Sequence, residues 1–184
     1  MGSVFLALFL SLSLSNAPEQ VKPVNARNII LLIGDGMGVS QIYAGMVTSK
    51  EPLNIEKFKS IGFARTYSED NFITDSGASG TAMATGKKTY NGAISVDKDQ
   101  QPLKTILEYA EEHGKATGLV ATSTSTHAPP AACIAHLASR GDYAAIAGVC
   151  LMSDVEVCVG GGWVQLHIGS DRGDGGGGGG GWGW

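Results

Sequence analysis

A continuous apolar segment, residues 28–33, runs directly into a glycine and places the strongest constraint on the fold. Its sequence, NIILLI, shows no alternation of polar and apolar residues. Such a segment is typical of a strand that is buried on both faces, as strands are in a parallel sheet. The first structural expectation is therefore a parallel sheet that is covered on both sides.

Short strand-like and helix-like segments alternate over residues 28–162. The predicted strands are residues 28–33, 62–67 and 117–121, and the predicted helices are residues 39–47, 55–58, 78–86, 103–113, 130–138 and 143–152. Pro102 and Gly114 bound one of these helices with the residues typical of a helix start and end. Alternation of this kind predicts an α/β fold, a three-layer α/β/α domain with a largely parallel central sheet.

The charge balance excludes one broad class of partner. The chain has thirteen Lys and Arg and seventeen Asp and Glu, which gives a net charge of −4. It therefore lacks the excess of basic residues expected of a nucleic-acid-binding protein. No internal segment approaches the roughly 20 apolar residues that a membrane span needs. The 184 residues suffice for one domain with a substantial core.

The two ends of the chain differ from its middle. Residues 4–14 form an apolar run of signal-peptide length, followed by small residues suited to cleavage, although no Lys or Arg precedes it. A buried N-terminal strand or helix is the alternative. Seven consecutive glycines near the C-terminus cannot offset their ordering entropy by side-chain burial. We predict a secreted or periplasmic protein with a signal peptide over 1–17, a linker over 18–27, an α/β domain over 28–162 and a disordered Gly-rich tail over 163–184.

Three cysteines, Cys133, Cys150 and Cys158, do not form a disulfide framework. The odd count leaves at least one unpaired, and the spacings of seventeen and eight match no metal motif. Cys133 lies in an apolar helical run and is expected in the core. A bridge between Cys150 and Cys158 stays open at this point.

Ligands of open α/β sheets collect outside the carboxyl ends of the strands, where three polar clusters follow strands in this sequence. The first cluster is residues 34–38, GDGMG. Its spacing differs from the dinucleotide-binding pattern G-x-G-x-x-G. Asp35, fixed at a strand end, would suit a hard metal ion or zinc. The alternative is a turn aspartate that bonds its own backbone.

The second cluster is residues 74–81, TDSGASGT. Ser76 would lie at a helix N-terminus, where free N–H groups and the helix dipole stabilise an alkoxide or a phosphate. Alternatively, Asp75 or Ser76 is an ordinary N-cap. The esterase pattern G-x-S-x-G is absent, so acyl transfer gains no support.

The third cluster, residues 122–130, contains His127 and is followed by Arg140. His127 could bind or neighbour a metal ion, and the planar guanidinium of Arg140 suits a phosphate. A capping histidine and a solvated arginine are the plainer alternatives. His136 lies among apolar helix neighbours and is expected to be a core residue.

Together, the three clusters resemble the alkaline phosphatase family. The matching segments read NIILLIGDGMGVSQ, ITDSGASGTAMATGKKTYNGAISVD and ATSTSTHAPPAACIAHLASR, in the family's order, within about residues 28–162. The resemblance implies a metal-dependent phosphomonoesterase on an alkaline-phosphatase-like fold. It also implies Zn²⁺ and Mg²⁺ as cofactors, small-molecule phosphate monoesters as substrates, and a homodimer.

Individual residues acquire roles through this resemblance. It implies that Ser76 is the nucleophile, phosphorylated during turnover and bound to zinc, and that Asp35 bridges a zinc and the magnesium. It implies that Arg140 binds the phosphate and that Asp75 orients this arginine. His127 falls where the family places an Asp or a His near the magnesium site. Metal coordination would activate the serine hydroxyl as an alkoxide.

Two departures from the family pattern define the alternatives. Pro129 stands where the family has a Ser or Thr hydroxyl that helps to bind magnesium. The family's other metal ligands come from a C-terminal half that this sequence does not contain, so we expect an incomplete fold and an incomplete site. A non-catalytic truncated fragment is therefore one alternative. A phosphodiesterase or sulfatase of the same superfamily is another, although Ser76 and the residues after it lack the sulfatase context.

Overall fold

The computed structural model describes residues 26–162. The chain divides into two compact units, Met1–Ile33 and Gly34–Trp184, and all elements described below belong to the second. The predicted signal peptide over 1–17, nearly all of the predicted linker over 18–27 and the predicted tail over 163–184 lie outside the described residues.

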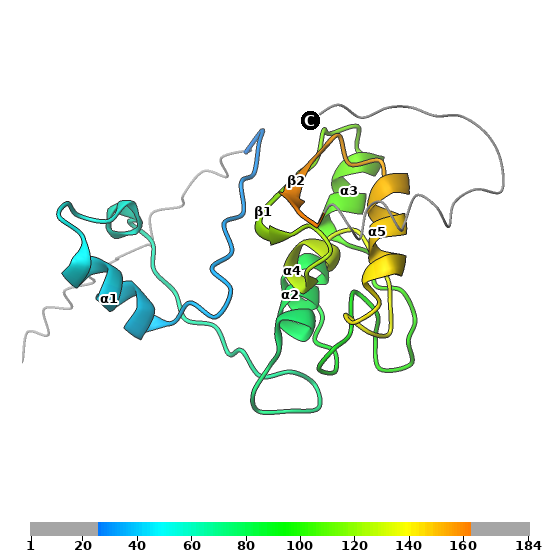
Figure 1. Ribbon diagram of the computed structural model, residues 1–184, viewed down its shortest axis with the longest axis horizontal. Coiled ribbons are helices and arrows are strands. Elements are labelled where there is room, and N and C mark those ends of the chain that lie inside the picture. The colour runs from blue at the N-terminus through cyan, green and yellow to red at the C-terminus, as the bar shows by residue number, and fades with distance from the viewer. Residues whose placement is uncertain (1–25, 163–184) are drawn as a thin grey trace, which may run out of the picture. The chain divides into compact units, whose positions relative to one another are not determined.

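The second unit contains a small parallel sheet with helices beside it (Figure 1). The elements, in chain order, are α1 (Val39–Thr48), η1 (Asn54–Lys57), α2 (Ser76–Thr85), α3 (Ile106–Glu112), β1 (Gly118–Thr124), α4 (Ala128–Ala131), α5 (Tyr143–Met152) and β2 (Val157–Gly161). β1 and β2 pair in parallel, with Leu119 opposite Cys158. α4 and α5 form the crossover between the two strands, as a parallel pair requires. The predicted α/β class with a parallel sheet is confirmed in this incomplete form.

Most predicted helices are confirmed, and two of them are shorter than predicted. Residues 143–152 form α5, whose N-cap Asp142 accepts a hydrogen bond from the Ala145 N–H at 3.1 Å. α3 begins only after Thr105, whose hydroxyl accepts the Glu108 N–H in a capping box. Pro102, predicted at a helix start, instead pairs with Val96 in an isolated bridge. Of the predicted helix 130–138, only Pro130 and Ala131 are helical, as the last two residues of α4.

Two predicted strands, residues 28–33 and 62–67, are wrong for the structure as described. Both segments lie outside any strand, and Ile30 is 85% exposed. A strand that is apolar on both faces needs neighbours on its edges and a layer over each face. Among residues 26–162 the sheet has only β1 and β2. The prediction of a third strand at residues 117–121 is confirmed by β1, whereas β2 was not predicted because its glycines lower strand propensity.

The core lies between α2, α4 and α5 and consists mainly of small side chains. Ile94 and Ile146 are fully buried, and the other members are Ala84, Ala128, Ala131, Cys133, Ile134 and Ala135. A Cβ on Gly80 would lie 3.1 Å from the Ala132 Cβ, so α2 and the α4 region approach closely. The core position predicted for Cys133 is confirmed.

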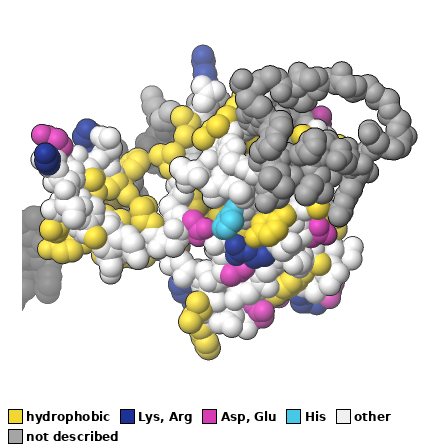
Figure 2. All heavy atoms as spheres, in the orientation of Figure 1, with side chains coloured by type: hydrophobic (Ala, Val, Ile, Leu, Met, Phe, Trp, Pro, Cys, Tyr) yellow, Lys and Arg dark blue, Asp and Glu magenta, His cyan; other side chains and the backbone are white. Residues whose placement is uncertain are grey.

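Many large apolar side chains remain at the surface. Figure 2 shows hydrophobic side chains spread over the visible face, and Phe63, Phe72 and Ile61 are each more than 80% exposed. Exposed apolar area of this extent is unusual for a complete soluble domain. None of the helices in residues 26–162 is long and apolar enough to cross a membrane.

Candidate active site

The N-terminus of α2 is the centre of the candidate site. Asp75 is the N-cap, and its Oδ1 accepts the Ala78 N–H at 2.8 Å. Ser76 is therefore the first residue of the helix, where backbone N–H groups without helical partners face outward. The helix reads SGASGTAMAT, and its small side chains allow five of its ten residues to be buried. Burial of this helix fixes the position of its first turn.

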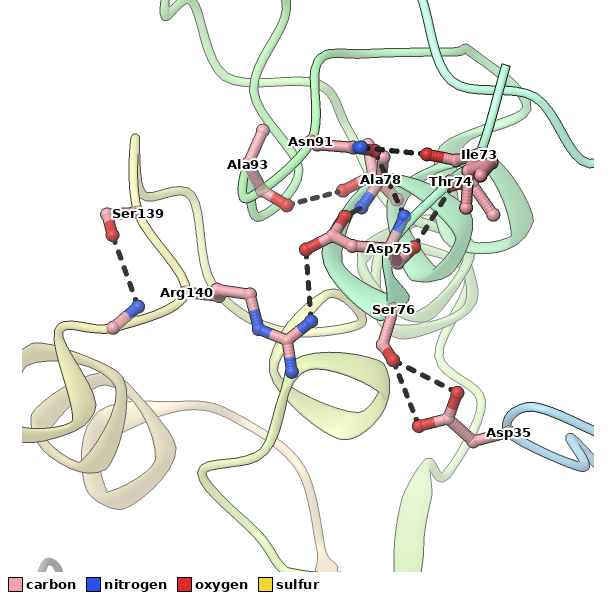
Figure 3. A network of polar contacts seen from close by, with 12 residues as sticks. Asp35, Ile73, Thr74, Asp75, Ser76, Ala78, Asn91, Ala93, Ser139 and Arg140 are labelled. Carbon is pink, nitrogen blue, oxygen red and sulfur yellow. Dashed lines mark hydrogen bonds and ion pairs between the residues drawn. The ribbon is translucent and has the colours of Figure 1, made fainter. Parts of the chain in front are cut away.

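The Ser76 hydroxyl faces the carboxylate of Asp35. Ser76 Oγ lies 3.0 Å from Asp35 Oδ1 and 3.1 Å from Oδ2, so the hydroxyl can donate to either carboxylate oxygen (Figure 3). Asp35 is held in a turn that the Met37 N–H closes onto the Gly34 carbonyl at 3.1 Å, with Gly36 at φ +66°. A positive φ is a conformation that glycine adopts without strain. The first two sequence clusters thus meet at one point.

The Asp75 carboxylate also holds Arg140. Arg140 Nη1 donates to Asp75 Oδ2 at 3.0 Å, and both side chains are roughly one-quarter exposed. The Arg140 backbone N–H donates to the Gly92 carbonyl at 2.7 Å, which anchors the residue at its main chain as well. Burial raises the pKa of Asp75, but the Ala78 N–H and the Arg140 guanidinium outweigh it, and the net shift is downward. Asp75 therefore remains a carboxylate that keeps the arginine next to Ser76.

Asn91 is a further component of this network that the sequence interpretation missed. Its Oδ1 accepts the Asp75 N–H at 3.0 Å, and its Nδ2 donates to the Ile73 carbonyl at 2.9 Å (Figure 3). Asn91 therefore fixes the chain on the N-terminal side of the nucleophile candidate. The sequence pointed to Asn91 only through its place in the TYNG stretch. Hydrogen bonds to backbone groups do not depend on which residues carry those groups, so they produce no recognisable sequence pattern.

Gly77 completes the packing under Ser76. A Cβ on Gly77 would lie 2.8 Å from the Ala93 carbonyl oxygen, closer than such contacts occur in proteins. The absence of a side chain lets the first turn of α2 rest directly on the turn after Asn91. Ser76 is thus positioned by backbone packing and by its neighbour Asp75.

His127 occupies the N-cap position of α4. Its backbone N–H donates to the Thr124 carbonyl at 3.0 Å, and its side chain makes no capping hydrogen bond. Pro129 lies in the first turn of the same helix, where its missing N–H costs nothing. The structure brings Asp35 to Ser76 and Arg140 to Asp75, whereas the His127 side chain is in neither pair.

His136 makes two polar contacts through its ring nitrogens and is also largely buried. Its Nδ1 lies 2.8 Å from the Ser95 carbonyl oxygen, and its Nε2 lies 2.9 Å from Glu108 Oε1. A carbonyl oxygen only accepts, so Nδ1 carries a proton and donates it. The side chain is 22% exposed, so the expected core placement holds only in part, and the Glu108 pairing was not foreseen.

The side chains of the candidate site supply part of what a metal ion needs. Asp35 and Ser76 bring oxygen donors to one point, and oxygen ligands suit Mg²⁺ and are common for Zn²⁺. Within residues 26–162, no group of three or more His, Cys, Asp and Glu side chains is arranged to hold a metal. A catalytic zinc normally has three protein ligands. Asp35 and Ser76 could therefore supply some of the ligands of a metal ion, and the others would have to come from elsewhere.

Comparison with known proteins agrees with this geometry. The sequence model described as alkaline phosphatase matches residues 26–169, more than three-quarters of the chain. The chain belongs to the alkaline phosphatase family. The family resemblance predicted from the three clusters is confirmed.

Relatives of the family match over most of this chain. Alkaline phosphatase 4 of Bacillus subtilis is 44% identical over 164 residues, which cover 80% of this chain and 35% of that protein. Streptomycin-6-phosphate phosphatase of Streptomyces griseus is 40% identical over 149 residues, covering 76% of this chain and 33% of that protein. The chain thus spans about one-third of the length of these curated relatives.

Solved structures of the family share the fold. The alkaline phosphatase of the Antarctic bacterium TAB5 superposes with a TM-score of 0.70 at 37% identity, covering 75% of this chain and 44% of that one. A variant of the same protein, in which a histidine is replaced by aspartate and Mg is bound in the M3 site, gives a TM-score of 0.71 at 36% identity. The match covers 75% of this chain and 43% of that one. The alkaline-phosphatase-like α/β class is therefore confirmed at the level of the fold.

Proposed function

We propose that the protein is a metal-dependent phosphomonoesterase that acts through a phosphoserine intermediate on Ser76. The observation that carries the proposal is the position of Ser76 Oγ, 3.0 Å from Asp35 Oδ1 and at the N-terminus of α2. Arg140 is held by the residue that precedes this serine. Ser76, Asp35 and Arg140 thus lie close to one helix end, which supports their proposed roles as nucleophile, metal ligand and phosphate-binding residue.

Each residue has a separate task in the proposed reaction. Arg140 binds two oxygens of the phosphate monoester, because a guanidinium pairs with phosphate in a bidentate manner. Ser76 Oγ releases its proton to solvent and attacks phosphorus, the bond from phosphorus to the alcohol oxygen breaks, and the alcohol leaves with a proton taken from solvent. Water attacks the phosphoserine and releases inorganic phosphate and the free hydroxyl. The backbone N–H groups at the start of α2 and the Arg140 charge stabilise the transferring group in both steps.

Metal ions belong to the proposal through Asp35, Ser76 and His127. Asp35 and Ser76 would share a Zn²⁺ ion, which supplies Lewis-acid activation of the serine hydroxyl when bound. Asp35 and His127 would adjoin Mg²⁺, in a site that lacks a hydroxyl at Pro129 and relies on water instead. The remaining ligands would come from residues beyond 26–162. Mg is bound in the M3 site of the TAB5 phosphatase variant, which supports Mg²⁺ as one of the metals in the proposal.

Substrates, location and assembly follow from the same proposal. Small phosphate monoesters are the substrate class, in line with a relative named for streptomycin 6-phosphate. The signal-like pattern of residues 1–17 supports secretion or export to the periplasm. A homodimer is the proposed assembly by resemblance to the family.

The experiment that tests the proposal is hydrolysis of a chromogenic phosphate monoester at alkaline pH, with Zn²⁺ and Mg²⁺ added. Ser76→Ala should abolish turnover, and a chelator should do the same to the parent protein. Ser79→Ala is the matched control, because Ser79 lies in the same helix and has no proposed role. A protein quenched in acid during turnover should carry one phosphoryl group on the peptide that contains Ser76.

Two outcomes would contradict the proposal. Turnover that survives Ser76→Ala would exclude the serine as nucleophile. A folded protein that binds Zn²⁺ but neither turns over nor becomes phosphorylated would favour the alternative of a non-catalytic fragment. Circular dichroism of each variant separates loss of function from loss of fold.

A further inference from the structure

A pair of thiols lies away from the residues proposed for catalysis. Cys150 is in the last turn of α5 and Cys158 is in β2, and their sulfur atoms are 3.3 Å apart. We propose that Cys150 and Cys158 form an intrachain disulfide that joins the crossover helix to the second strand. The proposal rests on this juxtaposition and is independent of the function assigned to Ser76.

The distance is compatible with bond formation without a change of fold. A disulfide requires the sulfurs to approach by about a further 1 Å, which small side-chain rotations provide. Both residues are half-buried. Sulfur atoms that are already in contact lie within reach of a bond.

The third cysteine provides an internal contrast. Cys133 is buried in the core, and its thiol lies 3.7 Å from the Pro129 carbonyl oxygen. No group of three metal-binding side chains exists within residues 26–162, so the Cys150–Cys158 pair is better suited to a disulfide than to a metal there. The proposal therefore predicts two reactive cysteines and one inert cysteine.

The local environment determines how the bond would form. Burial raises the pKa of Cys150 to about 12, helped by the hydrogen bond and the charge of Cys158. Cys150 is therefore a poor first nucleophile, since the thiolate is the reactive form. We assign the first attack to Cys158 and the closing step to Cys150.

The reaction balances with a disulfide of the glutathione class as oxidant. The Cys158 thiolate attacks one sulfur of the oxidant, forms a mixed disulfide and releases one thiolate. Cys150 loses its proton and attacks the Cys158 sulfur, which releases the second thiolate. Overall, two protein thiols are oxidised, one S–S bond forms, and the oxidant is reduced to two thiols.

The crosslink would stabilise the small sheet. Cys158 pairs in register with Leu119 of β1, and the Gly161 carbonyl at the end of β2 accepts the Ser125 N–H at 2.9 Å. A bond from α5 to β2 restricts the unfolded chain and keeps β2 in place beside β1. The segment that leads from β1 into α4 would be held more firmly as a result.

The test uses the whole chain, equilibrated with reduced or oxidised glutathione. In denaturant, the number of titratable thiols should fall from three to one. Peptide mapping without reductant should recover one crosslinked product that contains Cys150 and Cys158. The oxidised protein should unfold at a temperature higher by about 4 °C or more.

Three variants make the result specific. Cys133→Ala should retain the crosslink and the thermal shift, whereas Cys150→Ser and Cys158→Ser should each lose both. Retention of three thiols by the folded parent chain would overturn the proposal. It would equally fail if the oxidised chain carried glutathione on both cysteines, or a bond that includes Cys133.

Discussion

Arg140 donates a hydrogen bond to the Asp75 carboxylate across 3.0 Å, although the two residues are 65 positions apart in the chain. Asp75 uses its other oxygen to cap α2. One side chain therefore starts the helix that presents Ser76 and holds the cation beside it. This double use makes Asp75 the residue on which the geometry of the candidate site most depends.

Asp75→Asn should weaken this arrangement in a pH-dependent manner. The amide can still accept the Ala78 N–H, but it loses the charge that binds Arg140, so we expect the variant to be less stable by about 1–2 kcal/mol at pH 7. The folded-state pKa of Asp75 is lowered, burial notwithstanding, by the Ala78 N–H and Arg140. Its contribution is therefore present above the unfolded pKa near 4 and lost as pH falls through the lower folded value.

Urea denaturation of the parent and the variant at pH 7 and pH 3 measures this effect. The difference in unfolding free energy should shrink at the lower pH. Asp99→Asn is the control, because Asp99 pairs with Lys98 at the surface, where its side chain is 68% exposed. An Asp75→Asn difference that is unchanged between the two pH values would mean that the charge on Asp75 contributes nothing.

Gly77→Ala should displace the first turn of α2. The new Cβ would lie 2.8 Å from the Ala93 carbonyl oxygen, and a backbone atom cannot rotate away as a side chain can. Overpacking of this kind costs about 1–3 kcal/mol. Because Ser76 is the adjacent residue, turnover should fall together with stability.

Thermal unfolding and phosphatase assays of a second glycine variant provide the comparison. Gly148 lies within α5, and a Cβ there would meet no atom within 4 Å. Gly148→Ala should therefore be neutral or stabilising by up to about 1 kcal/mol, through helix propensity alone. Equal behaviour of the two variants would show that the close approach of Gly77 to Ala93 is unimportant.

Local features of the fold were predictable from the sequence, and non-local ones were less so. The bounds of α5 follow from an apolar run after a capping aspartate, both of which are local. Residues 28–33 read equally clearly as a buried strand, yet a strand forms only with partners, and pairing is a property of the whole sheet. Asp35, Asp75 and Arg140 were predictable because each lies in, or comes after, one of the three polar clusters of the sequence. Asn91 was missed because its hydrogen bonds go to backbone groups.

Asn91→Ala should loosen the segment before Ser76. The substitution leaves the half-buried Asp75 N–H without its partner and removes the exposed contact to the Ile73 carbonyl. The expected cost of about 1–3 kcal/mol comes mainly from the Asp75 N–H. Asn91→Asp should be as damaging, since it keeps the acceptor for Asp75 but turns a carboxylate oxygen towards the Ile73 carbonyl. Denaturation and turnover should both register the loss.

The control for these two variants is Asn54→Ala. The Asn54 side chain accepts a hydrogen bond from the exposed Lys57 ammonium at 2.8 Å, so its removal should change stability by less than about 0.5 kcal/mol. If Asn91→Asp retained parent-like stability and turnover, the Ile73 contact would have no role in holding the nucleophile candidate.

Glu108 and His136 should prove energetically coupled. Glu108 Oε1 meets His136 Nε2 at 2.9 Å, while its other oxygen accepts the Thr105 N–H at the start of α3. Burial raises the pKa of Glu108, but the Thr105 N–H and His136 lower it further, for a net downward shift. The carboxylate therefore stabilises the fold above its unfolded pKa near 4.3, and this contribution disappears as pH falls through the folded value.

A double-mutant cycle of Glu108→Gln and His136→Gln measures the coupling. At pH 7 the sum of the two single-variant losses should exceed the loss of the double variant by about 0.5–2 kcal/mol. At pH 3 this difference should be smaller, because Glu108 becomes protonated as pH falls through its lowered pKa. His136 also anchors the Ser95 carbonyl, so His136→Gln should lose more stability than Glu108→Gln. Full additivity at pH 7 would show that the two side chains lie close together without stabilising each other.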